Sequence, residues 1–240
     1  MADICAVIPA YNEAASVARV AAGALDAAGC ALVVDDGSTD GTAEAAAAAG
    51  ARVVRHKQNR GKGAAIATGL AWARGHGYEA AVFLDGDGQH DPGEICRLVE
   101  AYRQGADIVL GSRMQSRAGM PPLRAFTNFL TSLVTSCIAG CRISDSQSGF
   151  RLLRIDTAGW MAAEAGRFES ETEILIRAAR RGMKIRDVPV STIYAGEQSK
   201  IDPSADTGRF ILMALRLIFI ERQEVHLGKP HCTAGAGSRG

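Results

Sequence analysis

Residues 81–92, AVFLDGDGQHDP, begin as a short apolar run and end in carboxylates. An apolar run of this length, bounded by turn residues, is typical of a buried parallel strand. In open α/β sheets the ligand binds outside the carboxyl ends of the strands, so Asp85 and Asp87 are expected beside a ligand, and Gly86 allows close backbone approach. Two oxygen ligands one residue apart suit Mg²⁺ or Mn²⁺ on a substrate's phosphates. Taken alone, the stretch is equally well explained as an Asp-Gly turn with solvated carboxylates.

Outward from this stretch, short apolar runs alternate with helical segments. Strands are predicted at 5–9, 31–34, 52–54, 107–111, 152–153 and 184–190, and helices at 14–28, from 42, 64–74, 92–104, 126–139, 171–181 and 206–221. Such alternation predicts an α/β fold whose sheet is parallel and covered on both faces. We expect one domain over 1–222, ending in the amphipathic helix, and a disordered tail at 223–240.

Composition excludes several classes of protein. The net charge of +1 gives no overall field that would attract nucleic acid. The six cysteines form no CxxC pair, which fits reduced thiols in a cytoplasmic protein better than a disulfide framework or a zinc site. We expect no signal peptide, because no basic region precedes an apolar stretch at the N-terminus. No apolar run reaches the roughly 18 residues of a spanning helix.

Polar clusters follow four of the predicted strands. They are Tyr11-Asn12-Glu13, Asp35-Asp36-Gly37-Ser38, Asp85-Gly86-Asp87 and Gly111-Ser112-Arg113. In a parallel sheet these clusters gather at one edge, where their carboxylates repel unless a cation or hydrogen-bond donors compensate them. A nucleotide with a divalent metal supplies both, although any one cluster by itself is more often an ordinary strand–helix connection.

A further loop, NRGKG at residues 59–63, has the glycines, the lysine (Lys62) and the helix start of a phosphate-binding loop. It lacks the Walker A spacing, and no Gly-x-Gly-x-x-Gly follows the first strand, which argues against a dinucleotide oxidoreductase. The five histidines show no metal-ligand spacing, and only His90 is near the acidic stretch.

Together these motifs resemble the family 2 glycosyltransferases. The motifs are IPAYNE at 8–13, VDDGSTDGT at 34–42, NRGKG at 59–63, DGDGQH at 85–90 and GSR at 111–113. DSQSGFR at 145–151 and EQSKI at 197–201 are similar to the subgroup that acts on dolichyl or other polyprenyl phosphates. The resemblance implies a GT-A fold, a single Rossmann-like domain with a mostly parallel central sheet flanked by helices.

The same resemblance implies a metal-dependent, inverting transfer of mannose or glucose from GDP-mannose or UDP-glucose to a polyprenyl phosphate such as dolichyl or undecaprenyl phosphate. It assigns the nucleotide sugar to Pro9, Tyr11, Glu13, Asp36, Lys62, Asp85, Gly86, Asp87, Gln89, Arg113 and Lys200. Asp85, Asp87 and Gln89 would bind Mg²⁺ or Mn²⁺. The acceptor phosphate would be bound by Arg117, Arg124, Arg151 and Ser199. Gly86 stands where the family often has alanine, a change that should preserve the site.

The catalytic residues implied are Asp87 and Asp145. A phosphate acceptor is largely ionised at neutral pH, with a second pKa of about 6, so it needs positioning more than a strong base. Asp145 or Glu173 is the candidate if a base is used; Asp145 equally well anchors its loop to an arginine.

A polyprenyl acceptor lies in a membrane. We therefore expect a cytoplasmic protein that binds peripherally to the cytoplasmic face of that membrane. The apolar segments at 126–139 and 210–220 could lie in the interface, or could be ordinary core helices. Two alternative functions stay open: the same donor chemistry on a soluble acceptor, and a non-catalytic nucleotide-sugar-binding protein.

Overall fold

The computed structural model describes residues 4–113, 122–156 and 171–191, without the side chains of 122–124 and 171. The chain divides between Gln198 and Ser199 into two units, and every described residue belongs to the first. The predicted helix at 206–221 and the tail at 223–240 lie outside the described residues. The domain bounds therefore stay a prediction.

Seven strands form one sheet in the described part of the chain. They are β1 (Ile4–Ala10), β2 (Ala31–Asp35), β3 (Arg52–Arg55), β4 (Ala80–Phe83), β5 (Ile108–Ser112), β6 (Arg151–Arg154) and β7 (Ile185–Pro189). Their spatial order is β3-β2-β1-β4-β6-β5-β7. The α/β fold with a mostly parallel sheet is thereby confirmed.

The exception to parallel pairing is β6, which runs antiparallel to both β4 and β5. Because β6 reverses direction between them, β4 and β5 point the same way although they do not touch. The carboxyl ends of β1, β2, β4 and β5 therefore lie at one edge of the sheet, where the four polar clusters follow them.

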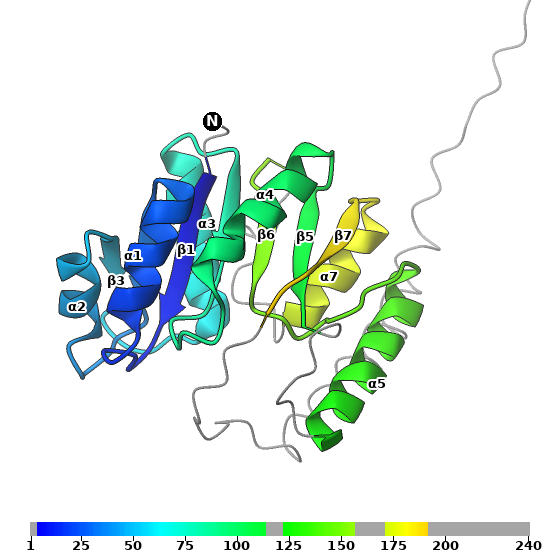
Figure 1. The fold of residues 1–240 in the computed structure, drawn as a ribbon, viewed down its shortest axis with the longest axis horizontal. Coiled ribbons are helices and arrows are strands. Elements are labelled where there is room, and N and C mark those ends of the chain that lie inside the picture. The colour runs from blue at the N-terminus through cyan, green and yellow to red at the C-terminus, as the bar shows by residue number, and fades with distance from the viewer. Residues whose placement is uncertain (1–3, 114–121, 157–170, 192–240) are drawn as a thin grey trace, which may run out of the picture. The chain divides into compact units, whose positions relative to one another are not determined.

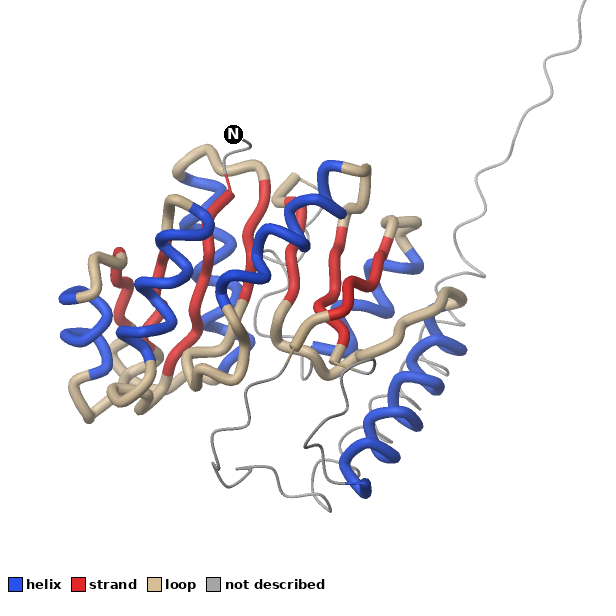
Figure 2. The backbone as a smooth tube through the Cα atoms, in the orientation of Figure 1, coloured by secondary structure: helices blue, strands red, loops and turns tan. Residues whose placement is uncertain are grey.

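Helices cover both faces of the sheet (Figures 1 and 2). They are α1 (Val17–Ala28), α2 (Thr42–Ala48), α3 (Lys62–Gly75), α4 (Ile95–Arg103), α5 (Pro122–Ala139) and α7 (Glu171–Arg180), with a 3-10 turn at Pro92–Glu94. In Figure 1, α1 and α4 lie in front of the sheet, and α3 and α7 lie behind it. None of these described helices is long and apolar enough to cross a bilayer.

The core forms where strands are apolar on both faces. Every residue of β1, β2, β4 and β5 is buried, as the continuous apolar runs predict for central strands. Helix α3 packs closely on β1, because a Cβ at Gly69 would lie 2.3 Å from Val7 Cγ1. This packing sets the start of α3, and with it Lys62, against the edge of the sheet that carries the polar clusters.

Candidate active site

The loops that follow β1, β2 and β4 are joined by hydrogen bonds. The backbone N–H of Asn12 donates to Ser38 Oγ at 2.9 Å, which links the loops after β1 and β2. Ser16 Oγ donates to the carbonyl of Gly86 at 2.7 Å, which links α1 to the acidic loop after β4. The structure thus brings these predicted clusters together, as the parallel pairing requires.

Asp85 lies against a lysine from a different element. Lys62 Nζ is 2.6 Å from Asp85 Oδ1, and Lys62 is the first residue of α3. Burial acts to raise the pKa of Asp85, but the neighbouring cations, Lys62 foremost, outweigh it and hold that pKa below its ordinary value. The carboxylate is therefore ionised and carries a cation beside it at neutral pH.

Asp87 is in a less favourable electrostatic position. Burial is the main cause that raises its pKa, and the charge of Asp85 adds to it. The backbone N–H of Gln89 donates to Asp87 Oδ1 at 2.9 Å and opposes the shift. Asp85 has a cation beside it, but Asp87 lacks one of its own. A further cation at this edge would therefore stabilise the ionised form of Asp87.

Gly149 lies directly against Asp85, a contact that the sequence did not reveal. A Cβ at Gly149 would stand 2.3 Å from Asp85 Oδ2 and 3.0 Å from Oδ1. The loop before β6 thus presses its backbone directly on the Asp85 carboxylate. The residue lies inside the motif at 145–151, which indicated a subgroup but gave no sign of this packing.

His90 stands behind the acidic loop and is 3% exposed. Its ring packs at 5.2 Å from that of Phe150, and its Nδ1 has no hydrogen-bond partner among the described residues. Burial lowers the pKa of His90 against the opposing pull of Asp85, so the ring is neutral near pH 7. The sequence expectation that His90 lies beside the site is confirmed.

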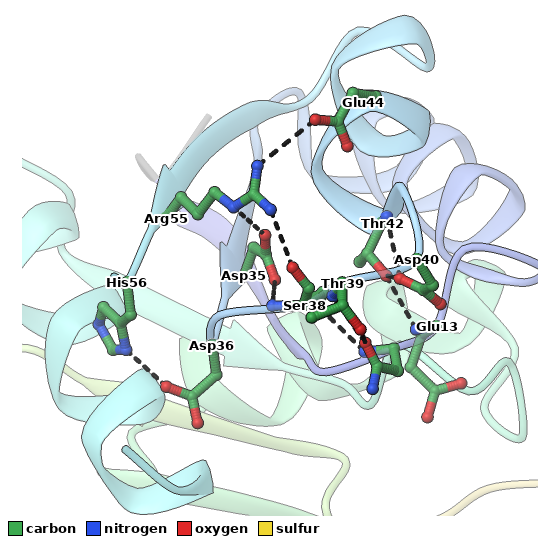
Figure 3. A network of polar contacts seen from close by, with 11 residues as sticks. Glu13, Asp35, Asp36, Ser38, Thr39, Asp40, Thr42, Glu44, Arg55 and His56 are labelled. Atoms are coloured by element: carbon green, nitrogen blue, oxygen red, sulfur yellow. Dashed lines mark hydrogen bonds and ion pairs between the residues drawn. The ribbon is translucent and has the colours of Figure 1, made fainter. Parts of the chain in front are cut away.

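Asp36, predicted to line the nucleotide pocket, is 3% exposed and binds the loop that precedes α3. Its carboxylate accepts N–H bonds from Arg60 at 3.0 Å and from Gly61 at 2.7 Å. His56 Nδ1 lies 2.6 Å from it on the other side (Figure 3). Asp36 thereby fixes the loop that carries Lys62, and His56 is a partner that the sequence did not single out.

Its neighbour Asp35 is fully buried and has a separate set of contacts. Arg55 Nε lies 3.0 Å from Asp35 Oδ2, and the N–H of Ser38 donates to Oδ1 at 2.9 Å (Figure 3). Arg55 also donates to the carbonyl of Ser38 at 2.8 Å. These bonds hold the turn after β2 in shape, so the two adjacent aspartates have different roles.

The loop after β1 presents the remaining predicted nucleotide contacts. Pro9 is buried in β1, Tyr11 is 43% exposed at the edge, and Glu13 is partly buried. Asn12 has a φ of +55°, and its side-chain oxygen accepts the N–H of Thr39 at 2.9 Å. Asn12 thus ties the loop after β1 to the loop after β2, and Tyr11 beside it is exposed.

Arg113 and Asp145 form a buried, bidentate ion pair. Arg113 Nε and Nη2 donate to the two carboxylate oxygens at 2.8 and 3.1 Å, and the Arg113 backbone N–H donates at 3.2 Å. The pair joins the end of β5 to the loop before β6. A carboxylate held in this way favours the anchoring role of Asp145 over the role of a base. Glu173, the other candidate base, is likewise bound, at 2.8 Å from Arg177 Nη2.

Arg151, predicted to contact the acceptor phosphate, is 2% exposed in β6 and donates to the Ser148 carbonyl. Its charge contributes to the low pKa of Asp85, which places it near the acidic loop. Arg117, Ser199 and Lys200 lie outside the described residues, and so does the side chain of Arg124. Their assignments stay predictions.

The donor set fits a divalent ion that also binds substrate. Among the described residues, no three histidine, cysteine or acidic side chains converge as a closed metal site. Asp85 and Asp87 supply two oxygens, and Gln89 follows on the same loop. Mg²⁺ and Mn²⁺ are commonly held by one or two carboxylates while phosphates and water complete the shell.

Comparison with known proteins identifies the family. Residues 5–155 match the sequence profile of Glycosyl transferase family 2. The chain is 32% identical over 203 residues to an undecaprenyl-phosphate mannosyltransferase of Micrococcus luteus, covering 79% of this chain and 83% of that protein. It is 30% identical over 220 residues to a UDP-N-acetylglucosamine–dolichyl-phosphate N-acetylglucosaminyltransferase of Methanococcus voltae, covering 81% and 88%.

A solved structure extends the similarity to the fold. Glucosyl-3-phosphoglycerate synthase from Mycobacterium tuberculosis, in complex with Mn²⁺, uridine diphosphate and phosphoglyceric acid, matches with a TM-score of 0.65 and 22% identity. The match covers 90% of this chain and 76% of that one, and it shows the GT-A fold. The matched residues 5–155 hold the acidic loop, the Lys62 loop and the Arg113–Asp145 pair. The chain therefore belongs to glycosyl transferase family 2 and is a glycosyltransferase.

Proposed function

We propose that this glycosyltransferase moves a hexose, mannose or glucose, from a nucleotide sugar to a polyprenyl phosphate with inversion at the anomeric carbon. The observation that carries the proposal is the edge of the sheet where Lys62, Asp85 and Asp87 meet. Two relatives with names that specify undecaprenyl and dolichyl phosphate acceptors support the acceptor class. These two names specify different sugars, so the hexose and its nucleotide are the finer part of the proposal.

The donor would lie along the loops after β1, β2 and β4. Tyr11 and Glu13 would contact the nucleoside, and Lys62 would place a positive charge beside the diphosphate. Asp85 and Asp87, with Gln89, would hold Mg²⁺ or Mn²⁺, which supplies Lewis-acid stabilisation of the leaving diphosphate when bound. The Mn²⁺ and uridine diphosphate named for the mycobacterial structure support this assignment.

The acceptor would enter from the side of β5 and β6, where arginines gather. Arg113, which we assign to the phosphates of the donor, is oriented by Asp145 at the end of β5 and adds positive charge on this side. Arg151 is buried close to Asp85. We propose that it contacts the acceptor phosphate together with Arg117, Arg124 and Ser199, and that Lys200 contacts the phosphates of the donor. Because a phosphate monoester is already ionised at neutral pH, these cations would position the nucleophile and no strong base is needed.

A soluble phosphate acceptor is the second candidate. It is favoured by one observation: the mycobacterial structure contains phosphoglyceric acid. The chemistry that would recognise either acceptor is the same, a phosphate dianion met by arginines. The two candidates differ in the apolar chain, and a polyprenyl acceptor places the protein at the cytoplasmic face of a membrane.

The test is a transfer assay on the purified full-length chain with Mn²⁺ or Mg²⁺. Donors are GDP-mannose, UDP-glucose and UDP-N-acetylglucosamine, and acceptors are a short, water-soluble polyprenyl phosphate and phosphoglycerate. We expect transfer to the polyprenyl phosphate, reduced at least about a hundredfold in Asp87→Asn. Asp26→Asn, an exposed aspartate on α1, is the matched control. Transfer to phosphoglycerate alone would contradict the acceptor assignment, and binding of donor without any transfer would favour a non-catalytic protein.

A further inference from the structure

Helix α5 exposes an apolar face and buries polar residues, which is the reverse of an ordinary surface helix. Four large apolar side chains lie exposed along one face, at a spacing of three and four residues: Phe126 (62% exposed), Phe129 (50%), Leu130 (47%) and Leu133 (48%). We call these four residues the apolar stripe. The opposite face buries polar residues instead, Asn128, Ser132 and Thr135. Amphipathic helices of globular proteins normally face their apolar side inward.

The buried polar face fixes this orientation. The N–H of Ser146 donates to Ser132 Oγ at 3.0 Å, and the N–H of Ile143 donates to Ser136 Oγ at 3.0 Å. Rotating α5 to hide the stripe would break these bonds and leave buried N–H groups without partners, which is costly. The stripe is therefore held outward by the fold.

Charge around α5 is one-sided. From Ser112 to Ser144 the chain carries four arginines and no acidic residue or lysine, whereas the whole chain is nearly neutral at +1. One of the four, Arg142, is exposed just beyond the end of α5. Arg113 is buried in its pair with Asp145, and the side chains of Arg117 and Arg124 lie outside the described residues, so Arg142 is the exposed arginine of the four that the structure describes. Exposed apolar side chains beside a cation, in a stretch without acidic residues, complement a surface that is apolar inside and anionic outside, as a bilayer with acidic lipids is.

The stripe is also linked to the candidate active site. Ser146, which α5 binds through Ser132, directly follows Asp145, and Asp145 holds Arg113. In Figure 1, α5 lies beyond α7 at the end of the structure that carries β5 and β7. A surface that docks here would be near the side proposed for the acceptor phosphate.

We propose that the apolar stripe of α5 docks the protein on an anionic lipid surface. The inference rests on the proposed function to the extent that a polyprenyl acceptor is held in such a surface. The stripe inserts its phenylalanine and leucine side chains among the lipid headgroups, and Arg142, exposed just beyond α5, faces the anionic groups. Docking on this face positions the lipid-borne phosphate near Arg113.

The experiment is co-sedimentation of the full-length protein with vesicles that contain no polyprenyl phosphate, either phosphatidylcholine alone or mixed with phosphatidylglycerol. We expect binding to the mixed vesicles, weaker at high salt, and at least about tenfold weaker for Phe129→Ser/Leu133→Ser. The matched control, Phe129→Leu/Leu133→Phe, keeps the apolar area and should bind like the wild type. Circular dichroism and the melting temperature confirm that both variants fold.

Three results would overturn the proposal. One is equal binding of the serine variant and the wild type to mixed vesicles. The second is a drop in melting temperature in the serine variant with vesicle binding unchanged, which means that another part of the chain covers the stripe. The third is a change from dimer to monomer in the serine variant, which means that a second copy covers it.

The docking surface and the acceptor can fail separately. Transfer to a water-soluble polyprenyl phosphate does not require lipid, so the serine variant should keep wild-type rates with that acceptor. If no transfer occurs with either protein while vesicle binding still depends on the stripe, the docking surface stands and the acceptor assignment fails.

Discussion

At the scale of single residues, the site depends on close approach as much as on charge. Asp85 has Lys62 on one side and the backbone of Gly149 on the other, and no larger residue fits at position 149 without moving the carboxylate. The conformation of Gly149 does not demand glycine, because its φ is not positive. Glycine is needed at 149 because a side chain there would overlap the Asp85 carboxylate. Replacing Gly149 therefore tests the position of Asp85 without straining the backbone.

Gly149→Ala should therefore impair transfer more than it impairs folding. Its new Cβ would meet Asp85 Oδ2 at 2.3 Å, and displacing a ligand by about 1 Å can cost on the order of a hundredfold in rate. The measurement is kcat/KM together with the unfolding midpoint. Gly75→Ala, where nothing lies within 4 Å of the new Cβ, is the control and should leave both unchanged. Wild-type transfer by Gly149→Ala would show that the Asp85 position is not critical.

Asp187 gives a prediction about pH. Burial is the main cause that raises the pKa of its carboxyl, although the N–H of Ser144 donates to Oδ2 at 3.1 Å. A raised pKa in the folded state means that the neutral acid is favoured there, so stability is lost as the pH rises through the folded pKa. Asp187→Asn keeps an acceptor for Ser144 and removes the charge.

We therefore expect Asp187→Asn to melt about 1–3 °C higher than the wild type at pH 7. The difference should shrink as the pH falls below the ordinary range of an aspartate, where the wild-type carboxyl is neutral as well. Thermal melts across this pH range measure it. A lower melting temperature for the variant at pH 7 would mean that the ionised carboxylate is stabilising, through Arg142 or Ser144.

At the scale of elements, buried ion pairs connect strand ends to the loops around the site. The Arg113–Asp145 pair is the clearest case, since both side chains are nearly inaccessible and three N–H groups converge on one carboxylate. Such a pair adds little net stability over apolar residues of the same shape. Removing one partner, however, leaves a buried charge without its counter-charge, at a cost of about 3–5 kcal/mol. Its main effect is to fix where the β5 loop and the β6 loop meet.

The two roles of Asp145 predict different pH–rate profiles for Asp145→Asn. If it anchors Arg113, Asp145→Asn should lower the unfolding free energy and raise KM for the acceptor, with the shape of the pH–rate profile unchanged. If it were also the base, the variant would show the same loss of stability and would in addition lose the acidic limb of that profile. We expect the first pattern. Denaturant unfolding and a pH series of kcat/KM on the same preparations distinguish them.

At the scale of the whole molecule, the sequence predicted those features that depend on local patterns. The continuous apolar runs located the buried strands, and the parallel strand ends brought Asn12 to Ser38 and Ser16 to Gly86, each pair joined by a hydrogen bond. The sequence could not predict the insertion of β6 between β4 and β5, because this pairing joins segments nearly seventy residues apart, such as Phe83 and Arg151. The same strand brings Gly149 to Asp85, so that contact was hidden for the same reason.

For helix α5, the sequence predicted the element but not which of its faces is exposed. Its sequence indicated a helix, and the structure confirms it, but the pattern of apolar residues left open whether they face the core or a membrane surface. Only the hydrogen bonds of Ser132 and Ser136 to the segment after the helix determine which side is outward. Asp36 is similar: its sequence position indicated a nucleotide contact, whereas its bonds to Arg60, Gly61 and His56 are visible only in the folded chain.

The donor site as a whole predicts a ligand-dependent gain in stability. A nucleoside diphosphate with Mn²⁺ would bind only when the loops after β1, β2 and β4 are assembled, so binding selects the folded state. At a hundred times its dissociation constant a ligand adds about 2.7 kcal/mol. For a chain of this size, that corresponds to a rise of roughly 5–10 °C in melting temperature.

Chelation with EDTA should remove the rise caused by GDP or UDP, and Asp87→Asn should reduce it. The melting temperature of the nucleotide-free protein should stay unchanged on chelation. An equal rise with and without metal would mean that Asp85 and Asp87 bind no ion in the nucleotide complex, and that Lys62 and the backbone of its loop carry the diphosphate alone.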